Sequence, residues 1–328
     1  MTTSLRFGIL STAKIGRTAV IPALKTAPNC EVTAIASREL GGAQQMASEL
    51  GIPTAYGSYD ELLADPEVDA IYNPLPNHLH APMTLAAVRA GKHVLCEKPL
   101  TLTATEAQQL QSDLATVPGS IVMEAFMYQF HPQWQAVFEI VASGEIGELR
   151  TVQTWFSYYN DDPANIRHNP AWGGGALMDI GCYAIHSARR LFGAEPRRAH
   201  GTLEVHPAWG VDTVASGILE FDHGHSTFTV SSLADPDQRV HVVGTKGRIE
   251  MVRPFNAWTD RTCTVRVGNG LAGELRELSF GPDDQYALMV EAFAAAALGG
   301  ERSPVSLDDA IANMAVIDAI AESAAPAN

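Results

Sequence analysis

The sequence has few cysteines and no long hydrophobic run, and each absence excludes a class of protein. The four cysteines, Cys30, Cys96, Cys182 and Cys263, are scattered and include no C-x-x-C pair. This argues against a disulfide framework and a zinc site, and it favours free thiols in the cytoplasm. No run of about 18 apolar residues occurs, so no segment is expected to span a membrane. The opening "MTTSLRFGIL" lacks the features of a secretory signal, which also favours a cytoplasmic location.

Positive charge is also scarce. The chain has 22 lysines and arginines against 37 aspartates and glutamates, for a net charge of −15, and no stretch is rich in basic residues. A phosphate backbone would be repelled, so nucleic acid is not expected as a partner. An anionic small molecule would need a local positive feature, and this narrows the search for a binding site.

The first third alternates short β-rich runs with helical segments. Helical patterns cover Arg17–Thr26, Leu40–Leu50, Ala81–Ala90 and Ala104–Ala115. The β-rich runs around them are "LRFGIL", "EVTAIAS", "PTAY", "VDAIYNPL", "HVLCE" and "SIVMEAF". Such alternation predicts βαβ units and a doubly wound parallel sheet, a Rossmann-type α/β domain over residues 1–125.

The pattern changes after about residue 126. Six strand-like runs between Ala199 and Phe280 are separated by turn signals such as "FDHGH" and "GTKG", which indicates mainly antiparallel pairing. Helices are predicted over Asp284–Leu298 and Leu307–Ser323. A chain of 328 residues usually needs more than one hydrophobic core. We therefore expect a second, α+β domain over residues 126–328, built on a large open sheet.

The turn after the first strand reads "STAKIG", where a dinucleotide fingerprint would read G-x-G-x-x-G. Gly16 is the one fingerprint glycine present, but Ser11 and Ala13 are small enough to let the backbone approach a pyrophosphate at the helix N-terminus. An ordinary tight strand-to-helix turn would look the same. The turn alone therefore leaves both interpretations open.

Arg38 follows the second predicted strand, about 20 residues beyond the turn, and an arginine there accommodates the 2′-phosphate of NADP. Ser37 precedes it, and both favour NADP over NAD. Glu39 is adjacent and could reach a ribose hydroxyl instead. The alternative interpretation is that Arg38 is an ordinary surface arginine in solvent with no role in binding.

Two loops follow the next strands of the predicted sheet. "CEKPL" places Lys98 at the carboxyl end of the fifth strand, where ligands of open parallel sheets bind, so we expect it near the nicotinamide. "NPLPNHLH" follows the fourth strand, and its Asn77 and His80 are expected to contact the cofactor. The H-x-H spacing there lacks further ligands nearby, so no metal is predicted.

Five segments in a fixed order carry a family resemblance: "STAKIG", "NPLPNHLH", "EKP", "VMEAFMYQFHPQ" and the GGG-x-x-x-D-x-G run from Gly173. Together they resemble the glucose–fructose oxidoreductase and inositol dehydrogenase (Gfo/Idh/MocA) family over essentially the whole chain. The resemblance implies a catalytic Lys98, flanked by Glu97 and Pro99 at the cofactor, and marks Asp179 as an acid of the substrate pocket. Many members have a histidine four residues after that aspartate. Tyr183 in its place points to the branch that resembles aldose 1-dehydrogenases and trans-dihydrodiol dehydrogenases.

Asp179, Tyr183 and His186 are spaced to share one face of a helix. The glycines before them are expected to let that helix begin close to a ligand. A nearby ammonium would lower the pKa of Tyr183, and we therefore expect Tyr183 to act as general base, assisted by Lys98, with Asp179 orienting the substrate. His186 either joins a proton relay or is a satisfied buried histidine.

The expected product of this chemistry is NADPH, formed by hydride transfer from C1 of an aldopyranose or from a cyclic diol carbon, so the chain is predicted to be an NAD(P)-dependent dehydrogenase acting on CH–OH groups. Arg167 is expected near the nicotinamide or substrate, and Trp172 either stacks on a sugar or merely packs. The full set of expected cofactor contacts is Ser11, Thr12, Ala13, Ile15, Gly16, Ser37, Arg38, Leu75, Asn77, His80, Glu97, Lys98, Arg167 and Trp172.

Two other functions stay open: a dehydrogenase or reductase of another polyol, deoxysugar or dihydrodiol, and a non-catalytic NADP-sensing regulatory protein. Lys98, Asp179 and Tyr183 are all present, which favours an enzyme. Alternating segments such as "STFTVSSL" predict that one face of the second sheet is left uncovered. We therefore expect a homodimer or homotetramer that associates through this face.

Overall fold

The computed structural model describes residues 4–270, 273 and 275–324. The chain divides into two compact units, and neither is one continuous stretch of sequence. The first unit runs to Met127 and includes Tyr286–Ile311, and the second comprises Tyr128–Gln285 and the chain from Ala312 onward. In the part of the chain that is described, no helix is long and apolar enough to cross a membrane.

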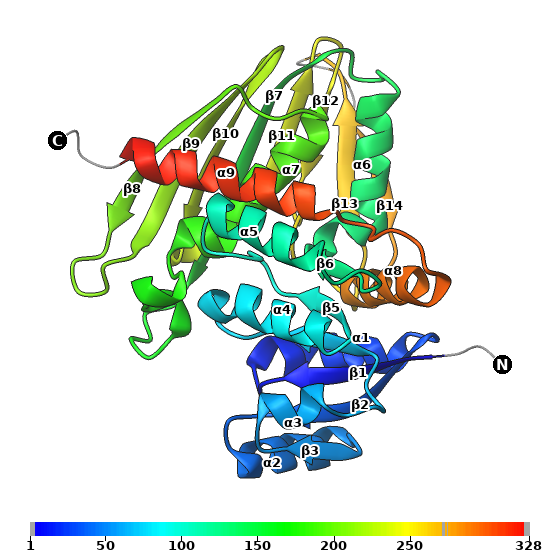
Figure 1. The fold of residues 1–328 in the computed structure, drawn as a ribbon. Helices are drawn as coiled ribbons and strands as arrows, with labels where there is room; N and C mark the ends of the chain where they lie inside the picture. Colours follow the sequence, from blue (N-terminus) through cyan, green and yellow to red (C-terminus); the bar gives the residue numbers. More distant parts are fainter. Residues whose placement is uncertain (1–3, 271–272, 274, 325–328) are drawn as a thin grey trace. The chain divides into compact units, whose positions relative to one another are not determined.

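The first unit is built on a parallel sheet with the strand order β3-β2-β1-β4-β5-β6 (Figure 1). This is the order of a doubly wound dinucleotide-binding fold. Its strands are β1 (Leu5–Leu10), β2 (Cys30–Ala36), β3 (Thr54–Tyr56), β4 (Ala70–Asn73), β5 (His93–Cys96) and β6 (Val122–Glu124). Its helical segments are η1 (Gly16–Val20), α1 (Ile21–Thr26), α2 (Leu40–Leu50), α3 (Tyr59–Leu63), η2 (Asn77–Leu79), α4 (His80–Arg89), α5 (Ala104–Leu114) and α8 (Gln285–Gly299).

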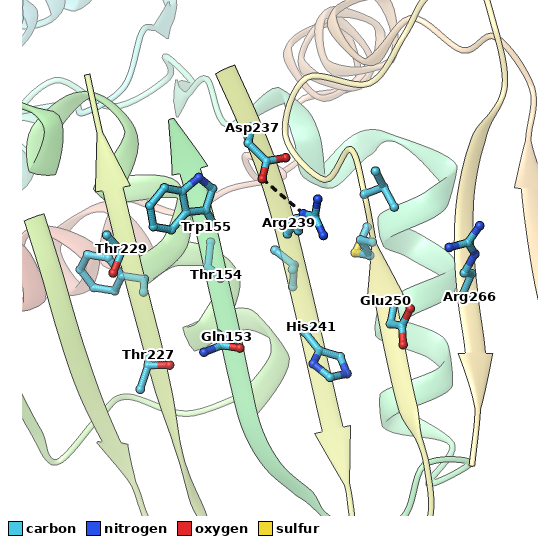
Figure 2. Close-up of a pocket in the computed structure, with 14 residues that line it drawn as sticks. Gln153, Thr154, Trp155, Thr227, Thr229, Asp237, Arg239, His241, Glu250 and Arg266 are labelled. Carbon is cyan, nitrogen blue, oxygen red and sulfur yellow. Dashed lines mark hydrogen bonds and ion pairs between the residues drawn. The ribbon is translucent and has the colours of Figure 1, made fainter. Parts of the chain in front are cut away.

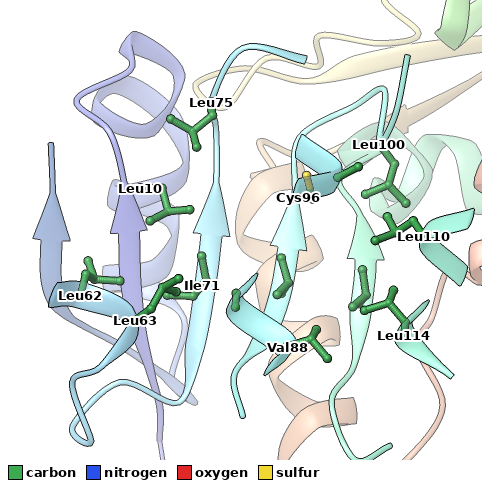
Figure 3. Close-up of a cluster of buried hydrophobic side chains, with 14 of the residues drawn as sticks. Leu10, Leu62, Leu63, Ile71, Leu75, Val88, Cys96, Leu100, Leu110 and Leu114 are labelled. Atoms are coloured by element: carbon green, nitrogen blue, oxygen red, sulfur yellow. The ribbon is translucent and has the colours of Figure 1, made fainter. Parts of the chain in front are cut away.

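The core of this unit lies between the sheet and the helices that cover it (Figure 3). Leu10, Ile71 and Cys96 of the strands are fully buried, and Leu62 and Leu110 from α3 and α5 pack against them. Strands that helices cover on both faces consist of nearly continuous apolar residues. The sequences of β1, "LRFGIL", and β5, "HVLC", follow this pattern.

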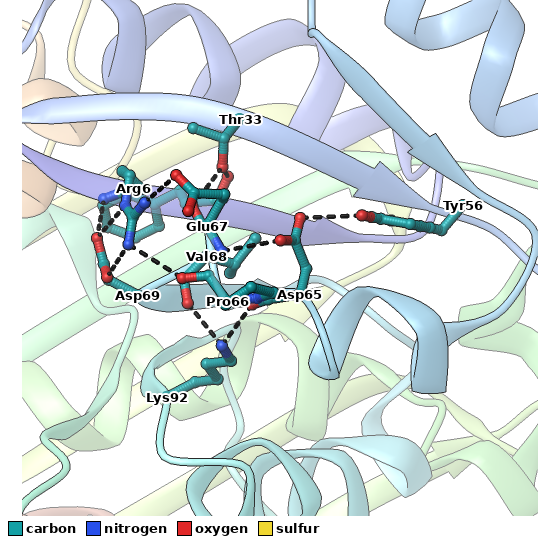
Figure 4. A network of polar contacts seen from close by, with 10 residues as sticks. Arg6, Thr33, Tyr56, Asp65, Pro66, Glu67, Val68, Asp69 and Lys92 are labelled. Carbon is teal, nitrogen blue, oxygen red and sulfur yellow. Dashed lines mark hydrogen bonds and ion pairs between the residues drawn. The ribbon is translucent and has the colours of Figure 1, made fainter.

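A polar network joins the start of β1 to the turn before β4 (Figure 4). The guanidinium of Arg6 donates two hydrogen bonds of 2.8 Å to the carboxylate of Asp69, and this contact lowers the pKa of Asp69. The Lys92 ammonium donates to the carbonyl oxygens of Asp65 and Val68, each at 2.7 Å. These bonds fix the entry to β4 and therefore the position of the loop that leaves it.

The second unit is built on a sheet with the order β14-β13-β12-β11-β7-β10-β9-β8. All pairs in it are antiparallel except β10 with β7. The strands are β7 (Leu149–Tyr159), β8 (Arg198–Val205), β9 (Asp212–Phe221), β10 (Gly224–Ser231), β11 (Leu233–Gly244), β12 (Arg248–Met251), β13 (Cys263–Gly268) and β14 (Arg276–Phe280). The helical segments from β6 onward are η3 (Met127–Phe130), α6 (Pro132–Ala142), η4 (Ile166–His168), η5 (Pro170–Trp172), η6 (Leu177–Gly181) and α7 (Cys182–Phe192). A last helix, α9 (Leu307–Ala324), is divided between the units.

Helices α6 and α7 pack on one face of this sheet. Val152 and Phe156 of β7 face them and are buried, whereas Gln153 and Trp155 point to the other side and are exposed. That other face carries mostly polar and charged side chains from neighbouring strands (Figure 2).

The expected α/β fold class, with a parallel sheet followed by a mainly antiparallel one, is confirmed. The division of the chain differs from the expected break at residue 125, because α8 returns to the first unit. The Phe293 ring of α8 lies 5.8 Å from that of Phe7 in β1, and the Asn29 side chain donates to the Glu291 carbonyl at 3.1 Å. Such distant contacts leave no local trace in the sequence.

Candidate functional site

In the turn after β1, Ser11 occupies the position of the first fingerprint glycine and adopts a backbone conformation typical of glycine. Ser11 has a φ of 74°, in the left-handed region that glycine favours. Its backbone N–H donates to the Ala36 carbonyl at 2.8 Å, and its hydroxyl accepts from the Ala13 N–H at 3.3 Å. The chain therefore keeps the tight path of the fingerprint at the cost of some backbone strain. Thr12 is exposed and Ile15 half-buried beside it.

Gly16 begins η1 at the end of this turn and is buried against Tyr72 of β4. A Cβ added at Gly16 would lie 3.6 Å from the Tyr72 ring, an ordinary contact. The Tyr72 hydroxyl donates a 2.7 Å hydrogen bond to Glu97, which follows β5. Burial, together with the nearby Glu97 carboxylate, raises the pKa of Tyr72. Tyr72 thus connects the turn after β1 with the loop after β5.

Arg38 lies exposed at the carboxyl end of β2, directly after Ser37. Within residues 4–270, 273 and 275–324, no carboxylate forms an ion pair with it. Its charge opposes the rise that burial gives to the pKa of Tyr59, so the guanidinium lies near that ring. An uncompensated cation at this position is available to an anionic ligand.

The loop after β4 is held from inside. The buried Asn73 side chain accepts from the Leu75 N–H at 3.3 Å and donates to the His80 carbonyl at 3.2 Å. The His80 ring is 1% exposed, and its nitrogens lie 2.6 Å from the Leu75 carbonyl oxygen and 2.7 Å from that of Pro99. Burial lowers the pKa of His80 to about 4, although both carbonyls, as acceptors, favour the protonated ring.

The His80 side chain therefore has a structural role, and its expected contact with the cofactor stays a prediction. Its two ring nitrogens are engaged by the chain itself, so His80 braces the loops after β4 and β5 against each other. Leu75 is buried and offers its carbonyl to this brace, and Asn77, half-buried, begins η2.

Lys98 lies half-buried in the loop after β5, between Glu97 and Pro99. The Glu97 N–H donates to the Asn73 carbonyl at 3.0 Å. On the other side of Lys98, the Leu100 N–H donates to the carboxylate of Glu124 at 2.8 Å. Glu124 is 2% exposed at the end of β6 and was missed by the sequence analysis. An acid inside the apolar run "SIVMEAF" was the available signal.

In the second unit, Asp179 lies in η6, where Arg167 and Tyr158 both contact its carboxylate. The Arg167 guanidinium forms an ion pair with its carboxylate at 2.7 Å, and the Tyr158 hydroxyl donates to the same oxygen at 2.7 Å. Burial and the Asp179 charge raise the pKa of Tyr158 well above its usual range. Tyr158, at the end of β7, is a second residue that sequence reasoning missed. Trp172 ends η5 and is 38% exposed.

Two of the glycines before η6, Gly174 and Gly175, serve close packing of the chain on itself. A Cβ on Gly174 would collide with the Arg167 carbonyl, and one on Gly175 (φ 112°) with the Asp212 carboxylate. That carboxylate accepts from the N–H groups of Leu177, at 2.7 Å, and Ala176. Asp212 therefore caps the helical segment that carries Asp179.

Tyr183 and His186 lie in α7, which continues η6, and both are buried, with Tyr183 5% exposed. Three aromatic rings surround the Tyr183 ring. His186 is fully buried, and its Nδ1 lies 2.5 Å from the Tyr128 hydroxyl. Of the two alternatives for His186, the structure favours the satisfied buried histidine.

Two family models match the chain. One, described as "Oxidoreductase family, NAD-binding Rossmann fold", matches residues 5–126. The other, described as "GFO/IDH/MocA C-terminal domain", matches residues 134–250. The two matches together cover more than half of the sequence.

Similar proteins include named enzymes. The D-xylose 1-dehydrogenase (NADP(+)) 2 of Haloferax volcanii is 45% identical over 322 residues, which cover 98% of this chain and 97% of the relative. The trans-1,2-dihydrobenzene-1,2-diol dehydrogenase of Mus musculus is 34% identical over 254 residues, covering 76% and 74%. The crystal structure of KijD10, a 3-ketoreductase from Actinomadura kijaniata in complex with NADP and TDP-benzene, superposes with a TM-score of 0.90 at 31% identity and 98% coverage of both chains.

The cap at Asp212 predicts a pH-dependent stability. Burial raises the pKa of Asp212 from 3.8 to about 6. Between these values the folded protein holds a proton that the unfolded chain does not. The wild type should therefore gain stability relative to Asp212→Asn as the pH falls from about 6 to 4, by up to about 3 kcal/mol. Urea denaturation at several pH values measures this gap. The exposed Asp222→Asn is the matched control, and a gap that stays constant over this range contradicts the assignment.

Proposed function

The chain belongs to the Gfo/Idh/MocA family of oxidoreductases, and on that basis we propose that it is an NADP-dependent dehydrogenase that oxidises the C1 hydroxyl of an aldopyranose. The observation that carries the proposal is the near-full-length similarity to the D-xylose 1-dehydrogenase of Haloferax volcanii. The retained Lys98, Asp179 and Tyr183 support it.

The residues of the first unit fit NADP. The left-handed Ser11 and the small Ala13 keep the turn after β1 close to the path of a dinucleotide fingerprint, and Gly16 begins the helix at which a pyrophosphate binds. Arg38, exposed and without a carboxylate partner among the described residues, suits a 2′-phosphate. Bound NADP⁺ supplies the acceptor for the hydride that leaves the substrate carbon.

The residues of the second unit suit a sugar. Asp179 keeps one carboxylate oxygen fixed by Arg167 and Tyr158, so its orientation toward a substrate hydroxyl is set before binding. We assign to Tyr183 the proton of the C1 hydroxyl, which its phenolate oxygen accepts as the C1–H hydride departs and a C1=O bond forms. The product is a lactone. Lys98 assists by stabilising the phenolate.

A cyclic diol is the second candidate substrate. The similarity to the trans-1,2-dihydrobenzene-1,2-diol dehydrogenase of Mus musculus supports it, over a smaller share of the chain. The same groups would serve, because a ring hydroxyl again loses its proton and its carbon loses a hydride.

The cysteines support a reducing compartment, and we place the protein in the cytoplasm. None of the four forms a disulfide, and three are buried. Burial raises the pKa of Cys30 to about 12 and raises those of Cys96 and Cys263. Protonated, buried thiols are poor nucleophiles, which agrees with cysteines that serve packing.

The open face of the second sheet supports self-association as a homodimer or homotetramer. Figure 2 shows Trp155, Arg239, His241 and Glu250 on neighbouring strands of this face. These residues line a hollow of ≈ 680 Å³. Both charge signs alternate there, as in the Asp237–Arg239 pair at 3.3 Å. A surface that presents both signs can be complementary to a copy of itself.

Turnover on a substrate panel tests the proposed function. Purified protein with NADP⁺ or NAD⁺ and a panel of aldopyranoses and cyclic diols should form NADPH with at least one aldose, measured by nicotinamide absorbance. Tyr183→Phe and Lys98→Ala should lose at least about 100-fold in kcat, because each removes a group from the proton-transfer step. Arg38→Ala should raise the KM for NADP⁺ about tenfold and leave that for NAD⁺ unchanged.

The outcomes separate the alternatives. Oxidation of diols alone would move the assignment to the second substrate class. Tight NADP⁺ binding with no reduction across the panel would contradict the dehydrogenase and favour the sensing protein. Full activity in Tyr183→Phe would remove Tyr183 from the proton step.

Self-association has its own measurement. Mass photometry should detect a dimer or tetramer of the 35.1 kDa chain. Trp155→Glu, on the exposed sheet face, should shift it toward the monomer because it places an unpaired charge in the interface. Leu298→Glu, at an exposed position of α8 outside the sheet face, is the control and should not change the assembly. A wild type that is wholly monomeric refutes the proposal.

A further inference from the structure

We propose that three buried rings, Tyr128, Phe156 and Phe255, form an aromatic cage that holds the phenol of Tyr183 in one orientation. These residues would be positioning residues for the proton step. The inference rests on the proposed role of Tyr183 and extends it to side chains that neither the family comparison nor the substrate chemistry assigns.

The cage contacts the Tyr183 ring from three separate segments of the chain. The ring centroids of Tyr128, Phe156 and Phe255 lie 5.9, 5.8 and 5.4 Å from that of Tyr183, at interplanar angles of 52°, 66° and 51°. Phe255 also stacks on Phe156 at 5.2 Å and meets Tyr128 edge-on at 5.4 Å. The three rings therefore brace one another as well as Tyr183, and rotation of the phenol about its side-chain bonds would require them all to move.

Tyr128 is locked in place by His186. Its hydroxyl lies 2.5 Å from His186 Nδ1, and the two rings meet edge-on at 85°. His186 follows Tyr183 by three residues on α7, so both residues lie on the same side of the helix. One tyrosine thus contacts both, and its hydroxyl fixes its ring relative to the helix that carries Tyr183.

Phe255 is carried by a segment without regular structure, Arg253–Asn256, which buried polar side chains hold on both sides. The carbonyls of Arg253, Pro254 and Phe255 accept from Gln133 at 3.0 Å, Trp134 at 2.6 Å and Gln285 at 2.9 Å. The N–H groups of Phe255 and Asn256 both donate to the Gln238 side chain, at 3.2 and 3.1 Å.

Hydrophobic packing of Phe255 alone does not require these hydrogen bonds to the Arg253–Asn256 backbone. An apolar core is stable with aliphatic or aromatic residues alone, whereas buried amide groups cost free energy unless they are hydrogen-bonded. Gln133 is fully buried, Gln285 is 2% exposed and Gln238 6%. Five bonds to four consecutive residues fix the backbone, and hence the ring of Phe255, far more tightly than hydrophobic contact would. Of the three cage rings, the one so fixed has the shortest centroid distance to Tyr183.

The test compares two fully buried phenylalanines. Phe255→Leu opens the cage, and Phe293→Leu, in the first unit, is the matched control for loss of a buried ring. Both should lower the melting temperature. Phe255→Leu alone should lower kcat by about 10- to 100-fold, because a slightly misplaced proton acceptor is costly, with KM for NADP⁺ unchanged. Tyr128→Phe keeps every ring and removes the hydroxyl that contacts His186, and it should lower kcat by about tenfold.

A second readout does not depend on turnover. Fluorotyrosine placed at position 183 should give one fluorine NMR signal in the wild type and in Phe293→Leu, and several signals or a broadened one in Phe255→Leu. If Tyr183→Phe stays fully active, the proposed role of Tyr183 in the proton step fails, while the fluorine spectra still decide whether the cage exists. If Tyr183→Phe is inactive but Phe255→Leu and Tyr128→Phe keep wild-type kcat and a single signal, the cage is overturned. Should Phe255→Leu not fold, Tyr128→Phe carries both measurements.

Discussion

A single buried carboxylate determines where the helix of the second unit's candidate site begins. The carboxylate of Asp212, at the start of β9, accepts hydrogen bonds from the backbone N–H groups at the beginning of η6. Gly175 has no side chain, and this leaves room for the carboxylate. Asp179 follows within the same turn and Tyr183 within the next, so the sheet fixes both through one cap. A shift of this anchor would move the carboxylate, the phenol and His186 together.

The first unit follows the same principle with different residues. The loops at the carboxyl ends of β1, β4 and β5 carry the expected cofactor contacts. Hydrogen bonds from buried polar side chains connect these loops to one another and to the sheet. Tyr72 bonds Glu97, His80 spans Leu75 and Pro99, and Glu124 holds the N–H of Leu100. Preformed loops lower the ordering cost of binding, which suits a site that must bind its cofactor in one register.

The sequence predicted what depends on local pattern. The alternation of strand-like and helical segments predicted the parallel sheet. The alternation of apolar and polar residues along the later strands predicted a second sheet with one uncovered face. It did not predict that Ser11 takes a glycine conformation, that Tyr158 and Arg167 share one oxygen of Asp179, or that α8 packs in the first unit. These features arise from contacts between residues far apart in the chain. The glycines from Gly173 were expected to let the helix begin close to a ligand, and the structure shows that Gly174 and Gly175 also lie against Arg167 and Asp212. Local sequence cannot identify such neighbours.

The central claim is hydride transfer from a sugar carbon to NADP, and isotope labelling tests it most directly. D-xylose deuterated at C1 is incubated with the protein and NADP⁺, and the reduced cofactor is analysed by mass spectrometry. The account predicts NADPH that carries one deuterium, and formation of the labelled cofactor should be lost with Tyr183→Phe. Oxidation of the sugar with no deuterium in the cofactor would contradict the claim, and label transferred in full by Tyr183→Phe would contradict the role of Tyr183.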